Sequence, residues 1–307
     1  MKSCKEFSDG VFASVEAGGT KFVCALGSAP DAILESTVIP TQTPEKTLPA
    51  AVGFLKAAEK KHGKIRAIGV CSFGPVGVDR DSPDYGRITT TPKALWRGTD
   101  ILGAFRSAFA VPAGFDTDVN GAALGEARWG AARGKSHVLY ITVGTGVGGG
   151  ALVRGLPLHG LVHPEMGHIR VPHNREADPY PGACPWHGDC LEGLVCGPAL
   201  AERCGKPARD IAPGDPVWDL AAGYLAAAAA TFTLVLSPEI IILGGGVMQS
   251  PGLLDKIRNR LPEFLGGYIA AEPLASDIKS YIAAPGLGNL SGVAGGFVLA
   301  RQAAGKE

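Results

Sequence analysis

The chain contains the same local pattern twice, and this repetition is the feature that most constrains its fold. In the first half, strand-forming residues 11–15 and 22–26 flank a turn at residues 16–21. In the second half, residues 137–143 and 151–154 flank the glycine-rich turn of residues 144–150. Each pattern is followed by alternating helical and strand-like segments. The sequence therefore predicts two duplicated α/β domains with a cleft between them.

Further elements follow from hydrophobic spacing and capping residues. Thr43 and Pro44 have the residue types of a helix N-cap and of a first helical position. The periodicity also predicts strands at residues 67–73, 113–116, 239–243 and 278–283, and helices near residues 100–109, 120–129, 252–265 and 291–303.

Length and composition agree with two globular domains. The 307 residues are about twice the usual length of one domain. With 46% hydrophobic and 19% charged residues, the chain has enough apolar surface to form a core. Lys and Arg number 29, and so do Asp and Glu, so the net charge is zero. That balance counts against a protein whose main role is to bind nucleic acid or an anionic membrane.

The same features predict a cytoplasmic protein. The seven cysteines are an odd number, which fits poorly with a fully paired disulfide framework. The first ten residues carry charges and no apolar run, so no signal peptide is expected. Residues 220–238 are uncharged, but their alanine-rich start predicts a buried helix leading into a strand rather than a membrane span.

The glycine-rich turns suggest phosphate binding. Gly144, Gly146 and Gly149 match the G-x-G-x-x-G pattern of dinucleotide-binding folds, but that pattern requires a helix directly after the glycines. Residues 151–157 predict a strand and a turn instead. A glycine turn between two strands can still present backbone N–H groups to phosphate. Two more glycine turns, at residues 18–21 and 244–246, have the same character, and together the three favour a nucleotide, although each alone could be a structural turn.

Cys184, His187 and Cys190 form a C-x₂-H-x₂-C motif, whose ligands suit tetrahedral zinc. A fourth ligand is needed, and four further histidines, His159, His163, His168 and His173, lie nearby in the sequence. Chance clustering of free thiols is the alternative, and a disulfide is less expected in a reducing compartment. Four protein ligands would make the zinc structural, because no coordination position remains for a reacting water.

Carboxylates and amides also gather at one point of the first half. Residues 116–120, Asp-Thr-Asp-Val-Asn, lie between a predicted strand and a predicted helix, where they are either helix-capping residues or part of a site at the cleft. Glu165 and Glu192 lie near the cysteine–histidine loop, and each could equally be a solvated surface group.

Taken together, these motifs resemble the ROK family of sugar kinases and regulators, and especially its fructokinase branch. The resemblance covers nearly the whole chain. The matching elements are Glu16–Lys21, Gly74–Pro75, Thr91–Lys93, Asp116–Asn120 with the following Gly-Ala-Ala-Leu-Gly-Glu, Ile141–Gly146, Pro164–His168, the cysteine–histidine loop with Leu191–Gly193, and Leu243–Gly246.

The resemblance implies a fold and a division into domains. The fold is the actin-like, hexokinase-type pair of α/β domains, with mixed sheets flanking a cleft and a C-terminal helix that crosses back to the first domain. We expect residues 1–121, with a helix at about 290–307, to form a small N-terminal domain. Residues 122–289 are then a large C-terminal domain that carries the zinc loop.

The resemblance also implies an activity, the transfer of the γ-phosphoryl group of Mg²⁺-bound ATP to O6 of fructose, with Asp118 as the catalytic base. A contact between Glu16 and Mg²⁺ through water stays open. The implied sugar-binding residues are Gly74, Pro75, Asn120, Glu165, His168 and Glu192. The implied nucleotide-binding residues are Gly18, Gly19, Thr20, Lys21, Gly144, Thr145, Gly146, Pro198, Gly244, Gly245, Gly246, Val247 and Met248. The implied ligands of a structural Zn²⁺ are His168, Cys184, His187 and Cys190.

Three positions depart from the pattern of many family members, and the fructokinase branch shares all three departures. Glu16, Thr117 and His187 stand where many members have Asp, Asn and Cys, which disfavours an N-acetylhexosamine as substrate. The expected partner is a small sugar, with no nucleic acid and no membrane. Family members are often dimers, so a homodimer is an open alternative.

Three other functions are alternatives to a fructokinase. A kinase of another hexose, mannose or glucose, would share every motif above. A non-catalytic sugar-binding protein could dispense with Asp118 and the glycine turns, which are all present. A DNA-binding regulator would need a helix-turn-helix domain before the first strand, where this sequence has ten residues.

Overall fold

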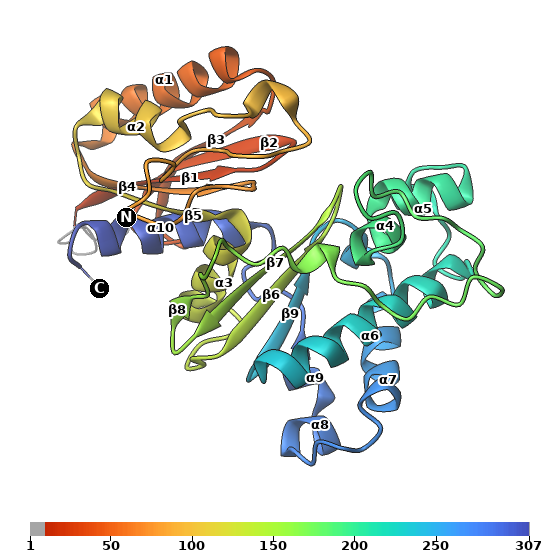
Figure 1. The fold of residues 1–307 in the computed structure, drawn as a ribbon. Coiled ribbons are helices and arrows are strands. Elements are labelled where there is room, and N and C mark those ends of the chain that lie inside the picture. Colours follow the sequence, from red (N-terminus) through yellow and green to blue (C-terminus); the bar gives the residue numbers. More distant parts are fainter. Residues whose placement is uncertain (1–9, 307) are drawn as a thin grey trace. The chain divides into compact units, whose positions relative to one another are not determined.

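The computed structural model describes residues 10–306 and divides into two compact units (Figure 1). The first unit includes the chain up to Gly134, residues Leu156–Pro164 and the chain from Gly286 onward, and the second includes Lys135–Gly155 and Glu165–Pro285. The first nine residues, for which no signal peptide is expected, lie outside the described part. The domain boundary expected after residue 121 falls inside a helix of the first unit, which the structure keeps whole.

The helices and strands follow the alternation expected of an α/β chain. Those of the first unit are β1 (Val11–Ala17), β2 (Lys21–Gly27), β3 (Ile33–Pro40), α1 (Pro44–His62), β4 (Ile65–Ser72), α2 (Ile101–Phe109), β5 (Ala113–Thr117), α3 (Asp118–Trp129) and α10 (Ser291–Ala303). Those of the second are β6 (Val138–Val143), β7 (Val147–Val153), α4 (Leu191–Val195), α5 (Gly197–Cys204), α6 (Val217–Leu236), β9 (Ile240–Gly244), α7 (Leu253–Leu265), α8 (Glu272–Ser276), α9 (Ile278–Tyr281) and β10 (Ile282–Ala283). The two-residue strand β8 (Leu156–Pro157) ends the second sheet, at the point where the chain returns to the first unit.

The two sheets have the same topology. The first has the order β3-β2-β1-β4-β5 and the second the order β8-β7-β6-β9-β10. In each, the opening strand pairs antiparallel with its hairpin partner and parallel with the strand that comes later in the chain. Both sheets are therefore mixed, the predicted duplication is confirmed, and the fold is the expected pair of actin-like α/β domains.

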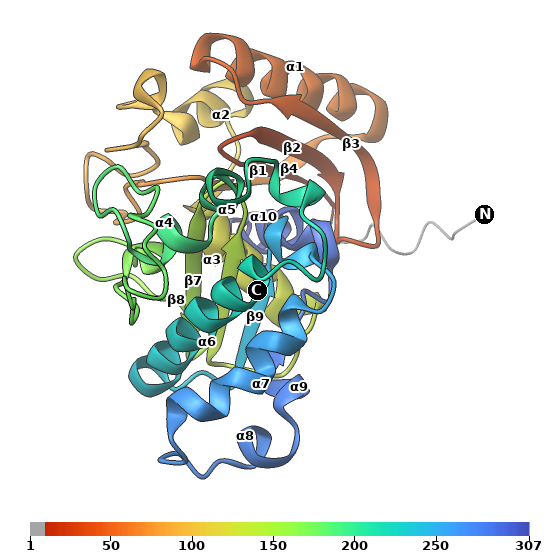
Figure 2. The same cartoon turned by 90° about the vertical axis from the view of Figure 1, so that its right-hand side faces the viewer.

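The first unit is a three-layer structure in which α1 and α2 cover one face of the sheet and α10 with α3 covers the other (Figures 1 and 2). Val293 and Phe297 of α10 are buried in a cluster with Phe12 of β1. A side chain at Gly69 of β4 would collide with the backbone of α10 at Gly296, so the absence of a side chain allows this close approach. The predicted return of the C-terminal helix to the first domain is confirmed.

A buried carboxylate fixes the point where the chain re-enters the first unit. Glu126 of α3 is fully buried. Its two oxygens accept hydrogen bonds from the backbone N–H groups of Gly286 (2.9 Å) and Leu287 (3.1 Å) and from the hydroxyl of Ser291 (2.6 Å). These bonds compensate for the loss of water around the carboxylate and attach α3 to the start of α10.

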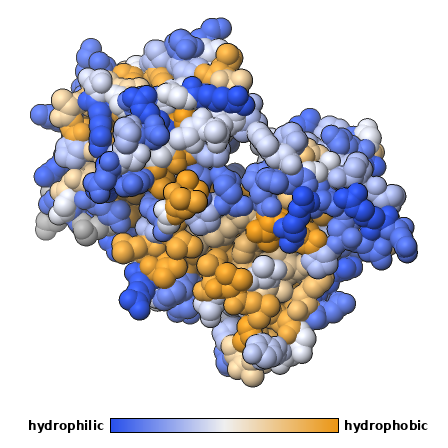
Figure 3. All heavy atoms as spheres, in the orientation of Figure 1, coloured by the Kyte–Doolittle hydropathy of each residue, from blue (hydrophilic) through white to orange (hydrophobic). Residues whose placement is uncertain are grey.

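In the second unit, the alanine-rich helix α6 lies along the sheet with α7 beside it (Figure 2). By length and composition α6 would be able to cross a membrane, but most of it is buried inside the protein, as predicted for a core helix. Its last turn is different, since Leu234 and Val235 are exposed. Figure 3 shows apolar residues gathered on the face of the molecule around this helix.

The structure corrects two of the predicted elements. Strand β7 begins at Val147, so the predicted turn of residues 144–150 is much shorter, and the later glycines lie within the strand. Gly149 is there because the Met166 side chain lies over it, 2.7 Å from where a Cβ would be. The predicted strand at 278–283 is mostly helix α9, because the Asp277 side chain caps its first turn by accepting from the N–H of Ser280 (3.3 Å).

Candidate active site and metal-binding loop

Three polar residues lie side by side across the first sheet. In the register of the parallel strands, Glu16 of β1 pairs with Cys71 of β4, and Cys71 pairs with Asp116 of β5. Burial raises the pKa of the Cys71 thiol well above its usual value, and the negative charges of Asp116, Glu16 and Asp118 raise it further. The carboxylates therefore form one acidic cluster around Cys71, near the carboxyl ends of these strands.

Glu16 is the most strongly perturbed member of this cluster. Burial raises the pKa of its carboxyl to about 7, and the positive charge of Lys21 counteracts part of that rise. The start of α10 packs directly against the carboxyl group, because Gly292 leaves room for it. Near neutral pH this group can thus lose or take up a proton, which an ordinary exposed glutamate cannot do.

Asp118 is the first residue of α3. Thr117 is the N-cap, and its Oγ1 accepts a hydrogen bond from the N–H of Asn120 (3.0 Å). The Asp118 Oδ1 accepts from the N–H of Val119 (2.9 Å), and its side chain is partly exposed. Thr117 thus provides the cap, and the Asp118 carboxylate lies in the favourable field of a helix N-terminus.

The turn between β1 and β2 contains the first predicted phosphate loop. The N–H of Gly18 donates to the carbonyl of Lys21 (3.0 Å), while Thr20 and Lys21 are exposed. The aliphatic end of Lys93 approaches within 3.2 Å of where a Cβ on Gly19 would be. Thr91–Lys93 is one of the motifs that carry the family resemblance, but the sequence assigns Lys93 no role. The structure places this second lysine beside the turn.

Gly74 and Pro75 follow β4, and their peptide bond is cis. The next residue, Val76, donates its backbone N–H to Nε2 of the buried His163 (3.1 Å). The ring of His163 also lies 3.3 Å from where a Cβ on Gly74 would be. The predicted sugar-binding loop is therefore held by a histidine that follows β8 in the chain.

In the second unit, several predicted nucleotide-binding residues meet at the carboxyl ends of β6 and β9. The N–H of Gly144 donates to the carbonyl of Gly146 (2.8 Å), and the N–H of Gly197, next to Pro198, donates to the carbonyl of Gly144 (2.7 Å). Gly245, which follows β9, has a positive φ of 94° and lies against the backbone of Val143 in β6. Residues 144–146, 198 and 244–248 thus surround one end of the second sheet.

The predicted sugar-binding carboxylates of the second unit lie next to this glycine turn. Glu192 Oε2 accepts the N–H of Val147 (2.9 Å) and lies 2.7 Å from where a Cβ on Gly146 would be. Burial, with the nearby negative charge of Glu192, raises the pKa of the Glu165 carboxyl to about 7. The two acids are therefore close enough to repel each other.

The four predicted zinc ligands come together. The ligand atoms of His168, Cys184, His187 and Cys190 all lie within 4.8 Å of one another. Nδ1 of His168 lies 3.7 Å from Sγ of Cys184 and 3.5 Å from Sγ of Cys190, and Nδ1 of His187 lies 3.6 Å from Sγ of Cys184. Tetrahedral zinc, with bonds of about 2.3 Å to sulfur and about 2.0–2.1 Å to nitrogen, would separate neighbouring S and N ligands by about 3.6 Å. The donor set and spacing therefore fit zinc.

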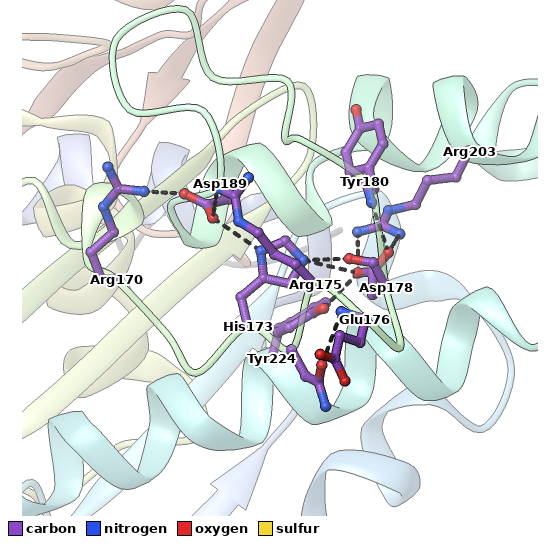
Figure 4. A network of polar contacts seen from close by, with 10 residues as sticks. Arg170, His173, Arg175, Glu176, Asp178, Tyr180, Asp189, Arg203 and Tyr224 are labelled. Atoms are coloured by element: carbon purple, nitrogen blue, oxygen red, sulfur yellow. Dashed lines mark hydrogen bonds and ion pairs between the residues drawn. The ribbon is translucent and has the colours of Figure 1, made fainter.

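A network that the sequence analysis missed supports the same loop (Figure 4). Asp189, between two of the candidate ligands, accepts from His173 (3.0 Å), Arg175 (2.6 Å) and Arg170. The bond from His173, together with Arg175, holds the pKa of Asp189 at about 2. In the sequence, this network is indicated only by the position of Asp189 inside the C-x₂-H-x₂-C motif and by Arg170 and Arg175 before that motif.

The same network continues to Asp178. Its carboxylate accepts two bonds from Arg203 (2.6 and 2.8 Å) and one from the hydroxyl of Tyr224 (2.5 Å), and His173 Nε2 lies 3.6 Å from it. Although burial acts to raise it, the bonds from Arg203 and Tyr224 hold the pKa of Asp178 at about 2. His173 thus links two carboxylates and connects the metal-binding loop to α5 and α6.

The candidate residues divide between the two units. Glu16, Gly18–Lys21, Gly74, Pro75, Asp118 and Asn120 belong to the first, and all the others to the second. Within each unit the structure brings the predicted residues together around the end of the sheet or at the metal-binding loop. Of the histidines left open as a fourth zinc ligand, His159, His163 and His173 each have other partners, at Asp116, Val76 and Asp189.

Known sugar kinases are similar to this chain over nearly its whole length. The chain is 42% identical to a fructokinase of Zymomonas mobilis over 302 residues (96% of this chain and 98% of that protein). It is 43% identical to a fructokinase of Pediococcus pentosaceus over 291 residues (94% and 97%). Among solved structures it resembles a ROK family glucokinase from Streptomyces griseus in complex with glucose and AMPPNP, with a TM-score of 0.74 and 27% identity over 95% of this chain and 100% of the other.

The family assignment rests on the whole chain rather than on one motif. The sequence pattern of the ROK family matches residues 12–303, which include both sheets, the metal-binding loop and α10 up to its last residue. The chain belongs to the ROK family.

Proposed function

We propose that this chain is an ATP-dependent sugar kinase that transfers the γ-phosphoryl group of ATP to O6 of fructose. The observation that carries the proposal is Asp118, a partly exposed carboxylate on the first turn of α3 beside the carboxyl ends of β1, β4 and β5. The two relatives named fructokinase, at 42% and 43% identity over nearly their full lengths, support fructose as the sugar.

In this proposal Asp118 is the general base. Its carboxylate accepts the proton of the O6 hydroxyl as the bond between O6 and the γ-phosphorus forms. At the same time the bond from the γ-phosphorus to the β–γ bridging oxygen breaks, and ADP leaves. A general base contributes about 10²- to 10⁴-fold to such a rate. Positioning and neutralisation of phosphate charge supply most of the remainder.

The glycine turns would bind the nucleotide, which enters with Mg²⁺ as part of the substrate. Gly18–Thr20 and Gly144–Gly146 would give backbone N–H groups to phosphate oxygens. Lys21, with Lys93 beside the same turn, adds positive charge. Residues 198 and 244–248 would contact adenosine, and the largely buried Glu16 carboxyl is the candidate for a water-mediated contact to Mg²⁺.

We propose six residues as ligands of the sugar hydroxyls. Gly74, Pro75 and Asn120 belong to the first unit, and Glu165, His168 and Glu192 to the second. Glu165 and Glu192 are carboxyl groups that can accept hydroxyl hydrogens in good geometry.

We propose a structural zinc held by His168, Cys184, His187 and Cys190, whose spacing supports tetrahedral coordination. Bound zinc would supply rigidity to the loop rather than chemistry, because all four ligands come from the protein. His168 faces the sulfur atoms with Nδ1, which leaves Nε2 for a sugar hydroxyl. The loop would thus fix a sugar-binding side chain, as outer ligand contacts fix a catalytic site.

The proposal also includes a cytoplasmic location and a homodimer. Analytical ultracentrifugation of the purified protein tests the second point. A sedimentation coefficient that fits one copy of 31.5 kDa at micromolar concentration would rule out the dimer.

An ATP-consumption assay coupled to ADP detection, with fructose, mannose, glucose and N-acetylglucosamine in turn, tests the activity. We expect the highest kcat/KM with fructose and none measurable with N-acetylglucosamine. A preference for glucose or mannose would replace the sugar but keep the reaction. Sugar binding without ADP formation for any of the four would identify a non-catalytic sugar-binding protein instead.

A further inference from the structure

His159 contacts the acidic cluster from a segment outside the first sheet. Its Nε2 lies 3.0 Å from Oδ2 of Asp116 and 3.2 Å from Oδ1 of the same residue. The Asp116 side chain is 4% exposed and that of His159 is 33% exposed. One imidazole N–H therefore spans both oxygens of a carboxylate that water can barely reach.

Asp116 uses its Oδ1 atom to hold the residues on either side of Asp118. Oδ1 accepts from the backbone N–H of Thr117 (2.7 Å) and from the side-chain Nδ2 of Asn120 (2.7 Å). Asn120 is 2% exposed, and its Oδ1 has no hydrogen-bond partner among the described residues. The amide of Asn120 is therefore held through Nδ2, and its orientation depends on that of the Asp116 carboxylate.

The other oxygen of Asp116 depends on His159. Within residues 10–306, His159 Nε2 is the partner recorded for Oδ2. A buried carboxylate oxygen that loses its partner leaves a charge without compensation, which is strongly destabilising. Without His159, the Asp116 carboxylate would have to rotate toward another donor, and that change would disturb its bonds to Thr117 and Asn120.

From this chain of contacts we propose that His159 is a positioning residue for phosphoryl transfer, which acts through Asp116 to hold the first turn of α3 and with it Asp118. The proposal rests on the proposed kinase function, because Asp118 is the base in that function. His159 itself need not touch the sugar, and its second ring nitrogen, Nδ1, has no role in this mechanism.

Two substitutions separate the two ring nitrogens. In His159→Gln, the side-chain amide nitrogen occupies roughly the position of Nε2 and can still donate to Asp116. In His159→Asn, the shorter amide occupies roughly the position of Nδ1 and cannot reach Asp116. His62→Asn is the matched control, because His62 Nε2 forms a similar bond to a carboxylate, Glu35 Oε2 at 2.8 Å, between α1 and β3.

Steady-state kinetics with fructose and ATP provide the test, with thermal melting to confirm that each variant is folded. We expect His159→Asn to lower kcat at least about tenfold, with the KM for ATP unchanged within about twofold, because the loss is in the transition state. His159→Gln should retain kcat within about threefold, and His62→Asn should behave as wild type. A general loss of stability would not lower kcat alone in His159→Asn while leaving kcat nearly unchanged in His159→Gln.

A second measurement needs no activity. Hydrogen bonding to Asp116 raises the pKa of His159, while its partial burial acts in the opposite direction and the Asp116 charge adds to the rise. Asp116 from β5 and His163 from the same segment are the titratable groups whose charges act there. In an NMR titration, His159 should have a pKa above the ordinary value of about 6.5 in the wild type, and a lower one in Asp116→Asn.

The outcomes distinguish the two levels of the argument. If the wild type forms no ADP with any hexose, the kinase function fails, and the positioning role fails with it. If the wild type is active but His159→Asn has normal kcat, only the positioning role is overturned. It is also overturned if His159→Asn is active and His159→Gln is not, since Nδ1 would then be the working atom. A His159 pKa at or below the ordinary value would exclude the bond to Asp116 on which the role depends.

Discussion

Nδ1 of His168 lies 3.5 Å from Sγ of Cys190, although 22 residues separate them in the chain. His168 belongs to a short 3-10 turn, Met166–His168, and Cys190 immediately precedes α4. The contact therefore joins two segments that share no strand pairing with each other beyond one isolated bridge, between Arg170 and Cys190. A metal at this point would tie both segments to one centre.

Removal of zinc should therefore lower stability and sugar affinity together. Structural zinc contributes about 10–16 kcal/mol in small zinc-binding peptides, and loss of even a few kcal/mol would lower the melting temperature by roughly 10 °C in a unit of this size. Cys190→Ser should bind less than a molar equivalent of zinc, melt earlier and have a raised KM for fructose. Cys204→Ser, at a partly exposed cysteine outside the cluster, is the control. Unchanged melting after complete metal loss would exclude a structural metal.

Asp118→Asn should lower kcat at least about a hundredfold, with little change in the KM for fructose or ATP. The amide keeps the size of the carboxylate and removes its ability to accept the hydroxyl proton. Asp100→Asn is the control, because Asp100 caps α2 by accepting from the N–H of Gly103 (2.8 Å) and should affect only stability. Near-normal turnover of the Asp118 variant would show that another group is the base.

Gly146→Ala should weaken sugar binding more than nucleotide binding. The added methyl group would lie 2.7 Å from Glu192 Oε2, so the carboxylate must move and its bond to the N–H of Val147 must weaken. We expect the KM for fructose to rise about tenfold, a change worth about 1.4 kcal/mol. Gly53→Ala, within α1 and with nothing near its Cβ position, should leave both KM values unchanged. A larger rise in the KM for ATP than for fructose would contradict this assignment.

The raised pKa of Glu16 gives stability a defined dependence on pH. Its folded-state pKa of about 7 lies above the unfolded value of 4.5, so the folded state binds the proton more tightly. The associated stability is fully present below pH 4.5 and is lost as pH rises through about 7, up to about 3 kcal/mol in all. In urea unfolding between pH 5 and 8.5, Glu16→Gln should therefore gain stability relative to the wild type as pH rises.

Glu35 provides a control of opposite sign for that experiment. Hydrogen bonds from His62 and Lys61 lower the pKa of Glu35, so its contribution is present at neutral pH and is lost as pH falls. Glu35→Gln should thus have its largest effect at neutral pH and none in strong acid. A Glu16 variant whose relative stability did not change with pH would show that this carboxyl is not perturbed.

The sequence predicted the architecture well because the repeated strand–turn–strand units and the helix caps are local signals. It failed at two elements whose type the spacing of apolar residues and glycines does not decide. Gly149 is predicted in a turn, but it lies in β7, where it pairs with Ile141 of β6, and the packing of Met166 leaves no room for a side chain there. Helix α9 was assigned to a strand because its apolar spacing is ambiguous, and the Asp277 cap decides the matter.

For the site, the sequence could supply the residue types but not their partners. The zinc motif narrowed the fourth ligand to several histidines, and it is geometry that separates His168, beside the cysteines, from His159, beside Asp116. The network of Asp178, Asp189 and Arg203 has no motif, because its members come from different loops and helices. The partners in such buried ion pairs are brought together only by the fold, so a single sequence contains no residue spacing that predicts them.

The return of α10 to the first unit has a consequence for how the protein is made. The first sheet is complete once β5 has been synthesised, yet the face that Val293 and Phe297 cover stays without them until α10 has been synthesised. The buried Glu126 carboxylate likewise lacks three of its hydrogen-bond donors until Gly286, Leu287 and Ser291 have been synthesised. The first unit therefore cannot complete its packing until the second unit and α10 have also been synthesised.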